Sequence, residues 1–156
     1  MKYDDTDFIR DFAKRTSHNL KVIEALEKAG CITFEVTQLV NSMLGLLVFP
    51  QQKYMKKIPK IPITDLQNQG WPIPKIIGNY KQVKDLNQLI RYLRNSIAHS
   101  NIEFKHNHKQ EIDNLILWNT AKKGVNWKVE ISQSDFKTIT NKLIDLLTQL
   151  KSNSNQ

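Results

Sequence analysis

All five prolines of this 156-residue chain lie between Pro50 and Pro74, and no other sequence feature constrains the fold as strongly. Proline removes a backbone N–H donor and disfavours helix at the residue before it, so a long helix is excluded there. Residues 49–80 are therefore expected to form a long irregular connection, in which residues 64–69 could make a turn or two of helix. The helices on either side need each other's apolar faces, so residues 1–150 are predicted to be one domain, followed by a polar tail at 151–156.

Helical periodicity surrounds this connection on both sides. Apolar residues three and four positions apart predict four helices, at about residues 7–29, 34–49, 81–100 and from Ser132 or Ser134 to Leu150. Gly30 is expected to stop the first helix, and Thr33 is expected to cap the second.

The segment before the last helix has a different pattern. Residues 115–118 and 127–131 are predicted to be two strands around a polar turn, and residues 102–104 are a candidate third strand. The expected fold is therefore mainly α, with four helices and a small β hairpin before the last one.

The formal charge of +8 points to an anionic partner. Much of it is concentrated between Phe49 and Lys84, where seven lysines accompany a single acid, Asp65. A solvated loop would show the same composition. The functional alternative is a phosphate-attracting surface, for which the candidate contacts are Lys53, Lys56, Lys57 and Lys60.

Composition narrows the compartment and the chemistry. The single cysteine, Cys31, forms no internal disulfide and builds no thiolate metal site. Acids near the N-terminus do not suit a signal peptide, and the longest apolar run, residues 44–49, is too short to cross a bilayer. A cytoplasmic protein without membrane contact and without a cofactor is expected.

The most informative motif lies near the end of the third predicted helix. Arg94, Asn95 and His99 form an Arg-Asn-x-x-x-His pattern, in which Asn95 and His99 stack one turn apart, away from the apolar stripe. Tyr92 flanks them. The spacing alone also fits a polar surface stripe on an amphipathic helix.

The Arg94-Asn95-x-x-x-His99 stretch resembles the signature of the HEPN family, and the looser likeness includes the helix ending in Leu46-Leu47-Val48-Phe49-Pro50 and the tryptophan-bearing hairpin. The resemblance is to a plasmid- and defence-associated HEPN nuclease group. It implies a four-helix HEPN-type bundle and a metal-independent endoribonuclease, acting as a toxin with a possible cognate antitoxin or as an anti-phage effector. Some relatives bind RNA or nucleotides without cutting.

The motif chemistry agrees with this interpretation. Histidine exchanges protons near neutral pH, and arginine gives two parallel hydrogen bonds to a phosphate, so His99 and Arg94 suit attack of a 2′-hydroxyl on phosphorus. The expected products are a 2′,3′-cyclic phosphate and a 5′-hydroxyl. One motif histidine per chain favours a homodimer with a shared active cleft, which the resemblance also implies.

Other residues offer competing sites. His106 and His108 could share a strand face as metal ligands, but a surface pair is the simpler interpretation. His18 is expected to be structural, and Trp71 is the tryptophan best placed to stack on a base. A non-catalytic HEPN RNA- or nucleotide-binding module is the alternative function, and a basic DNA-binding protein is the third class, although no compact helix-turn-helix is evident.

Overall fold

The computed structural model describes residues 5–48 and 54–150. These residues divide into two compact units, each of which is described by itself. The helical unit contains the described residues up to Lys57 and those from Thr140 onward, and the sheet unit contains Ile58–Ile139. The prediction that residues 1–150 form one domain stays a prediction.

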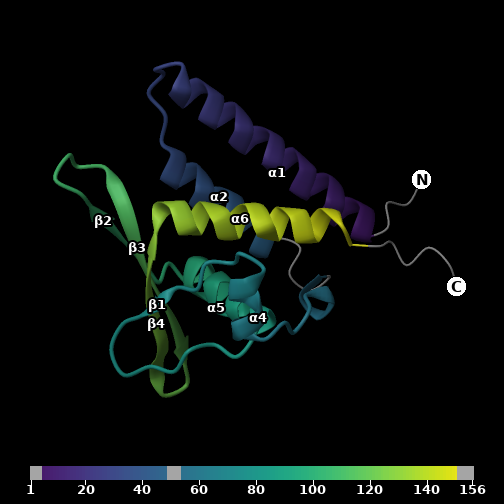
Figure 1. Cartoon of the computed structure of the whole chain (residues 1–156), viewed down its shortest axis with the longest axis vertical. Helices are drawn as coiled ribbons and strands as arrows, with labels where there is room; N and C mark the ends of the chain where they lie inside the picture. The colour runs from purple at the N-terminus through teal and green to yellow at the C-terminus, as the bar shows by residue number, and fades with distance from the viewer. Residues whose placement is uncertain (1–4, 49–53, 151–156) are drawn as a thin grey trace, which may run out of the picture. The chain divides into compact units, whose positions relative to one another are not determined.

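The helical unit is built from α1 (Asp5–Lys28), α2 (Glu35–Leu47), the short 3-10 helix η1 (Met55–Lys57) and the second half of α6 (Gln133–Thr148) (Figure 1). α1 packs against α2, and Gly45 lies where they approach, because a Cβ there would lie 3.0 Å from Cζ of Phe12. The absence of a side chain at Gly45 therefore permits the close approach of the two helices.

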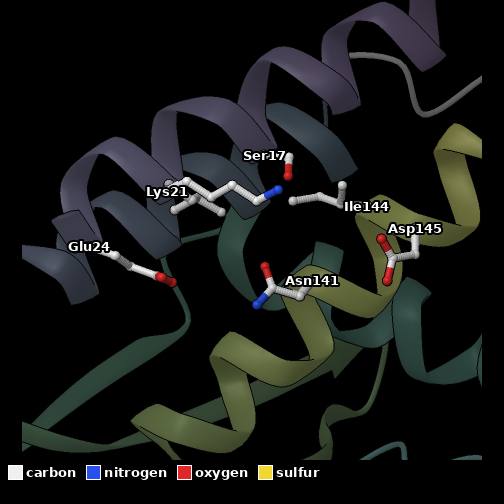
Figure 2. A pocket seen from close by; sticks show the side chains of 7 residues that line it. Ser17, Lys21, Glu24, Asn141, Ile144 and Asp145 are labelled. Carbon is white, nitrogen blue, oxygen red and sulfur yellow. The ribbon is translucent and has the colours of Figure 1, made fainter.

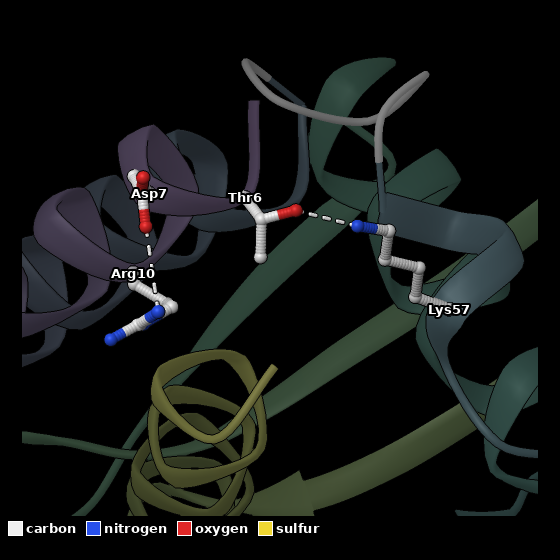
Figure 3. Close-up of polar contacts among 4 residues, drawn as sticks. All are labelled: Thr6, Asp7, Arg10 and Lys57. Atoms are coloured by element: carbon white, nitrogen blue, oxygen red, sulfur yellow. Dashed lines mark hydrogen bonds and ion pairs between the residues drawn. The ribbon is translucent and has the colours of Figure 1, made fainter. Parts of the chain in front are cut away.

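Two polar contacts hold the 3-10 segment in the helical unit. The hydroxyl of Tyr54 donates to the carbonyl of Leu46 at 2.5 Å. Lys57 Nζ donates to Oγ1 of Thr6 on α1 at 2.6 Å, as Figure 3 shows. Figure 3 also shows the ion pair between Arg10 and Asp7, which both lie on α1. Lys57 is therefore engaged within the protein in this structure.

The end of α1 follows its local sequence signal, but the start of α2 does not. Gly30 ends α1 with φ of 82°, as its conformational freedom predicts. The expected capping of α2 by Thr33 is wrong, because the N-cap residue is Phe34 and no side chain caps the helix.

The sheet unit carries four antiparallel strands in the order β1-β4-β3-β2, namely β1 (Lys75–Ile76), β2 (Ile102–His106), β3 (Ile112–Ala121) and β4 (Gly124–Ser132). The prediction of a mainly α four-helix bundle with a small hairpin is therefore wrong. The hairpin strands are longer than expected and each recruits a further strand, which makes the sheet a principal layer of the fold.

The proline-rich stretch contains the short helical segment that was expected at residues 64–69, and also a strand that was not expected. It contains the short helix α4 (Ile63–Asn68) and strand β1, whose Lys75 pairs with Glu130 of β4. Proline at position 62 suits the N-cap of α4, where no N–H is needed. The segment thus contributes a strand to the sheet instead of running entirely as irregular chain.

Helix α5 (Leu86–Ala98) packs against β3 through a stripe that is apolar except for the buried Ser96. Five side chains at three- and four-residue spacing are buried along it: Leu86, Leu89, Ile90, Leu93 and Ile97. The helix begins later than expected because the Asp85 carboxylate accepts from the Gln88 N–H at 2.8 Å, while Gln88 Oε1 accepts from the N–H of Lys84. This reciprocal pair fixes where the helix starts.

Candidate active site

The predicted catalytic residues lie in the last turn of α5 and directly after it. His99 is the C-cap residue, with φ of −103° and ψ of 12°. The N–H of Ser100 donates to the carbonyl of Ile97 at 3.1 Å, and the N–H of Asn101 donates to the carbonyl of Ser96 at 2.8 Å. This pair of bonds is a Schellman arrangement, which fixes the backbone that carries the imidazole.

The left-handed residue of this arrangement is unusual. α1 and α4 end with the same pair of bonds, and there the left-handed residues are Gly30 and Gly70. At the end of α5 the residue is Ser100, with φ of 56°. A side chain in this conformation costs about 1–2 kcal/mol, so backbone strain lies next to the exposed His99.

Asn95 is held from the sheet by a chain of side-chain amides. Its Nδ2 donates to Oδ1 of Asn119 at 2.8 Å, and Asn119 Nδ2 donates to Oδ1 of Asn126 at 2.6 Å. Asn119 lies on β3 at a register shift and is 3% exposed. An amide nitrogen has two N–H groups, so Asn95 keeps one N–H and its carbonyl oxygen for a ligand or for the imidazole one turn away.

Two more hydrogen bonds join the same helical turn to β3. The hydroxyl of Ser96, which is fully buried, lies 2.8 Å from the carbonyl of Trp118 on β3 and 2.9 Å from that of Tyr92 in its own helix, so the two carbonyls share its one proton. The N–H of Trp118 donates to the carbonyl of Asn101 at 3.2 Å. The turn that bears the motif is therefore tied to the sheet on both sides of His99.

Arg94 is half-buried, and its Nε atom is shielded from solvent. The arrangement combines a half-buried guanidinium, an exposed imidazole and an oriented amide within six consecutive residues. Such a set can bind a phosphate oxygen and move a proton near it.

Tyr92 lies on the same side of α5, three residues before Asn95. Its ring packs on Trp127 at 5.5 Å between centroids, and its hydroxyl accepts from Gln88 Nε2 at 3.1 Å. Because the ring is half-buried, one part of it is available to a ligand.

The predicted phosphate contacts are distributed over the chain. Lys53 lies outside the described residues. Lys56 is exposed in the helical unit, where Lys57 bonds to Thr6, and Lys60 is exposed in the sheet unit.

Base stacking on Trp71 is not supported by the structure. The side chain is only 7% exposed and belongs to the buried hydrophobic core of the protein. The loop position that suggested an accessible ring from the sequence is in fact a buried one.

The histidines outside the motif remain at the surface. His106 ends β2, and His108 lies in the following turn. The two histidines therefore do not share a strand face, which was the arrangement considered for metal ligands. Within residues 5–48 and 54–150, no group of three or more His, Cys, Asp or Glu residues is arranged to hold a metal ion. His18 is exposed on α1.

A hollow of about 190 Å³ lies in the helical unit between α1 and the end of α6 (Figure 2). Its charged lining residues are Lys21, Glu24 and Asp145, so acids outnumber bases. An acidic hollow of this size does not suit a polyanion.

Two residues that build the site were not predicted from the sequence. Ser96 is a polar residue inside an apolar helical stripe, and Asn119 is a buried amide near the end of a strand. Each breaks the local hydrophobic pattern, and that break was the signal available in the sequence.

A model of the family described as HEPN pEK499 p136 matches residues 1–154, and the chain belongs to this family. A search of the curated proteins gave no match, and a search of the solved structures gave none either. Membership indicates a nuclease or RNA-binding function, since HEPN domains are often ribonucleases.

Across the described part of the chain, no helix has the length and apolar character needed to cross a membrane.

Proposed function

We propose that this protein is a metal-independent endoribonuclease whose catalytic residues are Arg94, Asn95 and His99. The observation that carries the proposal is the exposed position of His99 at the end of a turn whose Asn95 is anchored by Asn119. Proton transfer to or from RNA needs an imidazole that the RNA can reach and a backbone that holds this imidazole in position.

The proposed reaction is an internal displacement. The 2′-hydroxyl loses its proton to a base, its oxygen attacks the adjacent phosphorus, and the bond from phosphorus to the 5′-oxygen breaks as that oxygen gains a proton. The products are a 2′,3′-cyclic phosphate and a 5′-hydroxyl. Arg94 stabilises the charge that grows on the phosphate oxygens, and the remaining N–H of Asn95 supports an oxygen or the imidazole.

Both a base and an acid are needed, and each chain supplies one motif histidine. The active unit is therefore proposed to be a two-fold homodimer that shares one cleft, with His99 of one protomer as base and that of its partner as acid. We also propose a role as a toxin, with a cognate antitoxin, or as a defence effector in the cytoplasm, because the family resemblance implies these settings.

The deciding experiment incubates the purified protein with total RNA in excess EDTA. Cleavage that leaves cyclic phosphate ends is expected from the parent. His99→Ala is expected to lose about 10²- to 10⁴-fold in rate, as general acid–base groups typically contribute. Arg94→Ala is expected to lose about 10²- to 10³-fold, as is typical when a donor that stabilises developing charge is removed. Exposed Lys14→Ala on α1 is the matched control. Activity that requires added divalent metal, or a His99→Ala variant that cuts at the parent rate, contradicts the proposal.

The second candidate is a non-catalytic RNA- or nucleotide-binding HEPN module. A hollow lined by lysines, tyrosines and amides beside Tyr92 favours binding and would serve equally without cleavage. Binding of RNA by the parent without any cut product supports this candidate over the first.

A further inference from the structure

The sheet unit contains a hollow of about 350 Å³, and Arg94, Asn95 and His99 are not among the residues that line it. It is formed by the segment before α5, by one face of α5 and by β4. The lining residues that matter to the argument are Tyr80, Lys81, Lys84, Gln88, Tyr92 and Asn126. Its size lies within the usual range of small-ligand sites.

The lining has a consistent chemical character. It combines two lysines and two tyrosine rings with the amides of four Asn and Gln residues, and its lining residues include no acid. Aromatic rings stack on nucleobases, amides bond to base edges, and lysines attract phosphate. This is the opposite of the acidic hollow in the helical unit.

The polar walls of the hollow are arranged in advance. Gln88 Nε2 donates to the Tyr92 hydroxyl and Gln88 Oε1 accepts from the backbone of Lys84, so both ends of this amide are fixed. Because the Tyr92 oxygen accepts that bond, its own O–H remains able to donate. The Asn126 oxygen accepts from Asn119, and its amino group likewise keeps its donors.

The hollow is also connected to the candidate catalytic turn. Gln88, Tyr92, Asn95 and His99 follow one another at four-, three- and four-residue steps, which places them along one face of α5. Tyr92 precedes His99 by about 10 Å along the helix axis. The amide chain from Asn126 through Asn119 ends at Asn95 and provides a second link.

We propose that this hollow is a nucleotide subsite, which holds one unpaired nucleotide of an RNA strand next to the phosphate at His99. The base stacks against Tyr80 and Tyr92, and Lys81 and Lys84 contact its phosphates. The inference deepens the proposed ribonuclease function and rests on it for the identity of the strand. A duplex would bind less well, because its bases are already stacked and paired.

The test measures binding of a fluorescent single-stranded RNA whose 2′-hydroxyls are all methylated, so that it cannot be cut by 2′-attack. Tyr80→Ala is expected to weaken binding by about 5- to 100-fold, the usual range for one stacked base. The double variant Lys81→Gln/Lys84→Gln is expected to lower the slope of affinity against salt by about 0.7 for each lysine. Tyr80→Phe keeps the ring and should bind as the parent does.

The matched control is Lys14→Gln/Lys28→Gln on α1, which removes the same charge from exposed positions of the helical unit and should leave the slope unchanged. Parent-like binding by Tyr80→Ala and by Lys81→Gln/Lys84→Gln overturns the subsite, as does a parent that fails to bind this RNA. A parent that binds through Tyr80 but leaves ordinary RNA uncut supports the subsite and contradicts only the ribonuclease proposal.

Discussion

Asn95 on α5 donates a 2.8 Å hydrogen bond to Asn119 on β3, and this contact joins the HEPN motif to the sheet. Asn119 is buried, and its amide oxygen accepts this bond while its amide nitrogen donates to Asn126. A residue outside the motif thus determines where the motif amide points.

Asn119→Ala is therefore expected to lower the free energy of unfolding by about 1–3 kcal/mol, because it leaves the Asn95 amide without its buried partner. Cleavage should also fall, since Asn95 is no longer oriented. Chemical denaturation and a cleavage assay measure the two effects. Asn126→Ala, at the exposed end of the amide chain, should cost less because water can replace it. An Asn119→Ala variant as stable as the parent contradicts this account.

Ser100→Gly should stabilise the protein by about 1 kcal/mol, because glycine adopts the left-handed conformation at the end of α5 without a side-chain penalty. Thermal unfolding should show a Tm higher by a few degrees for a chain of this length. Ser100→Ala is the control, since it keeps a Cβ and should give no gain. A Ser100→Gly variant with a lower Tm than the parent would show that Ser100 makes a stabilising contact.

Gly45→Val should destabilise the helical unit by about 1–3 kcal/mol, because even a Cβ at this position lies 3.0 Å from the Phe12 ring. Urea denaturation measures the loss. In a Phe12→Ala background the same substitution should cost much less, since the ring that it meets is gone. Equal losses in the two backgrounds would mean that the contact between α1 and α2 at Gly45 is unimportant.

The proposed shared cleft predicts that inactive chains poison active ones. Active protein is mixed with an excess of His99→Ala protein, and the subunits are allowed to exchange. The cleavage rate should then fall well below the rate that the same amount of active protein gives alone. In the control, the same excess of Lys14→Ala protein replaces the His99→Ala protein, and it should not inhibit cleavage. Activity that tracks the active chain alone shows that each protomer works independently.

Much of the local structure could be predicted from the sequence. The apolar stripe of α5 and the glycine that ends α1 depend on residues within a few positions of each other, and both were predicted correctly. The helical grouping of Asn95 and His99 on one side follows from the same short-range geometry, with His99 displaced only to the C-cap. Ser132 caps α6 by accepting from the N–H of Asp135, as their spacing indicates.

The tertiary structure decided the rest. β1 pairs Lys75 with Glu130, which lies 55 positions further along the chain, and so turned an expected irregular connection into part of a four-stranded sheet. The contact of Asn119 with Asn95 joins segments that lie 24 positions apart. Periodicity reports which face of an element is apolar, but strand pairing and side-chain partners depend on which distant elements meet that face, so these contacts appear only in the folded chain.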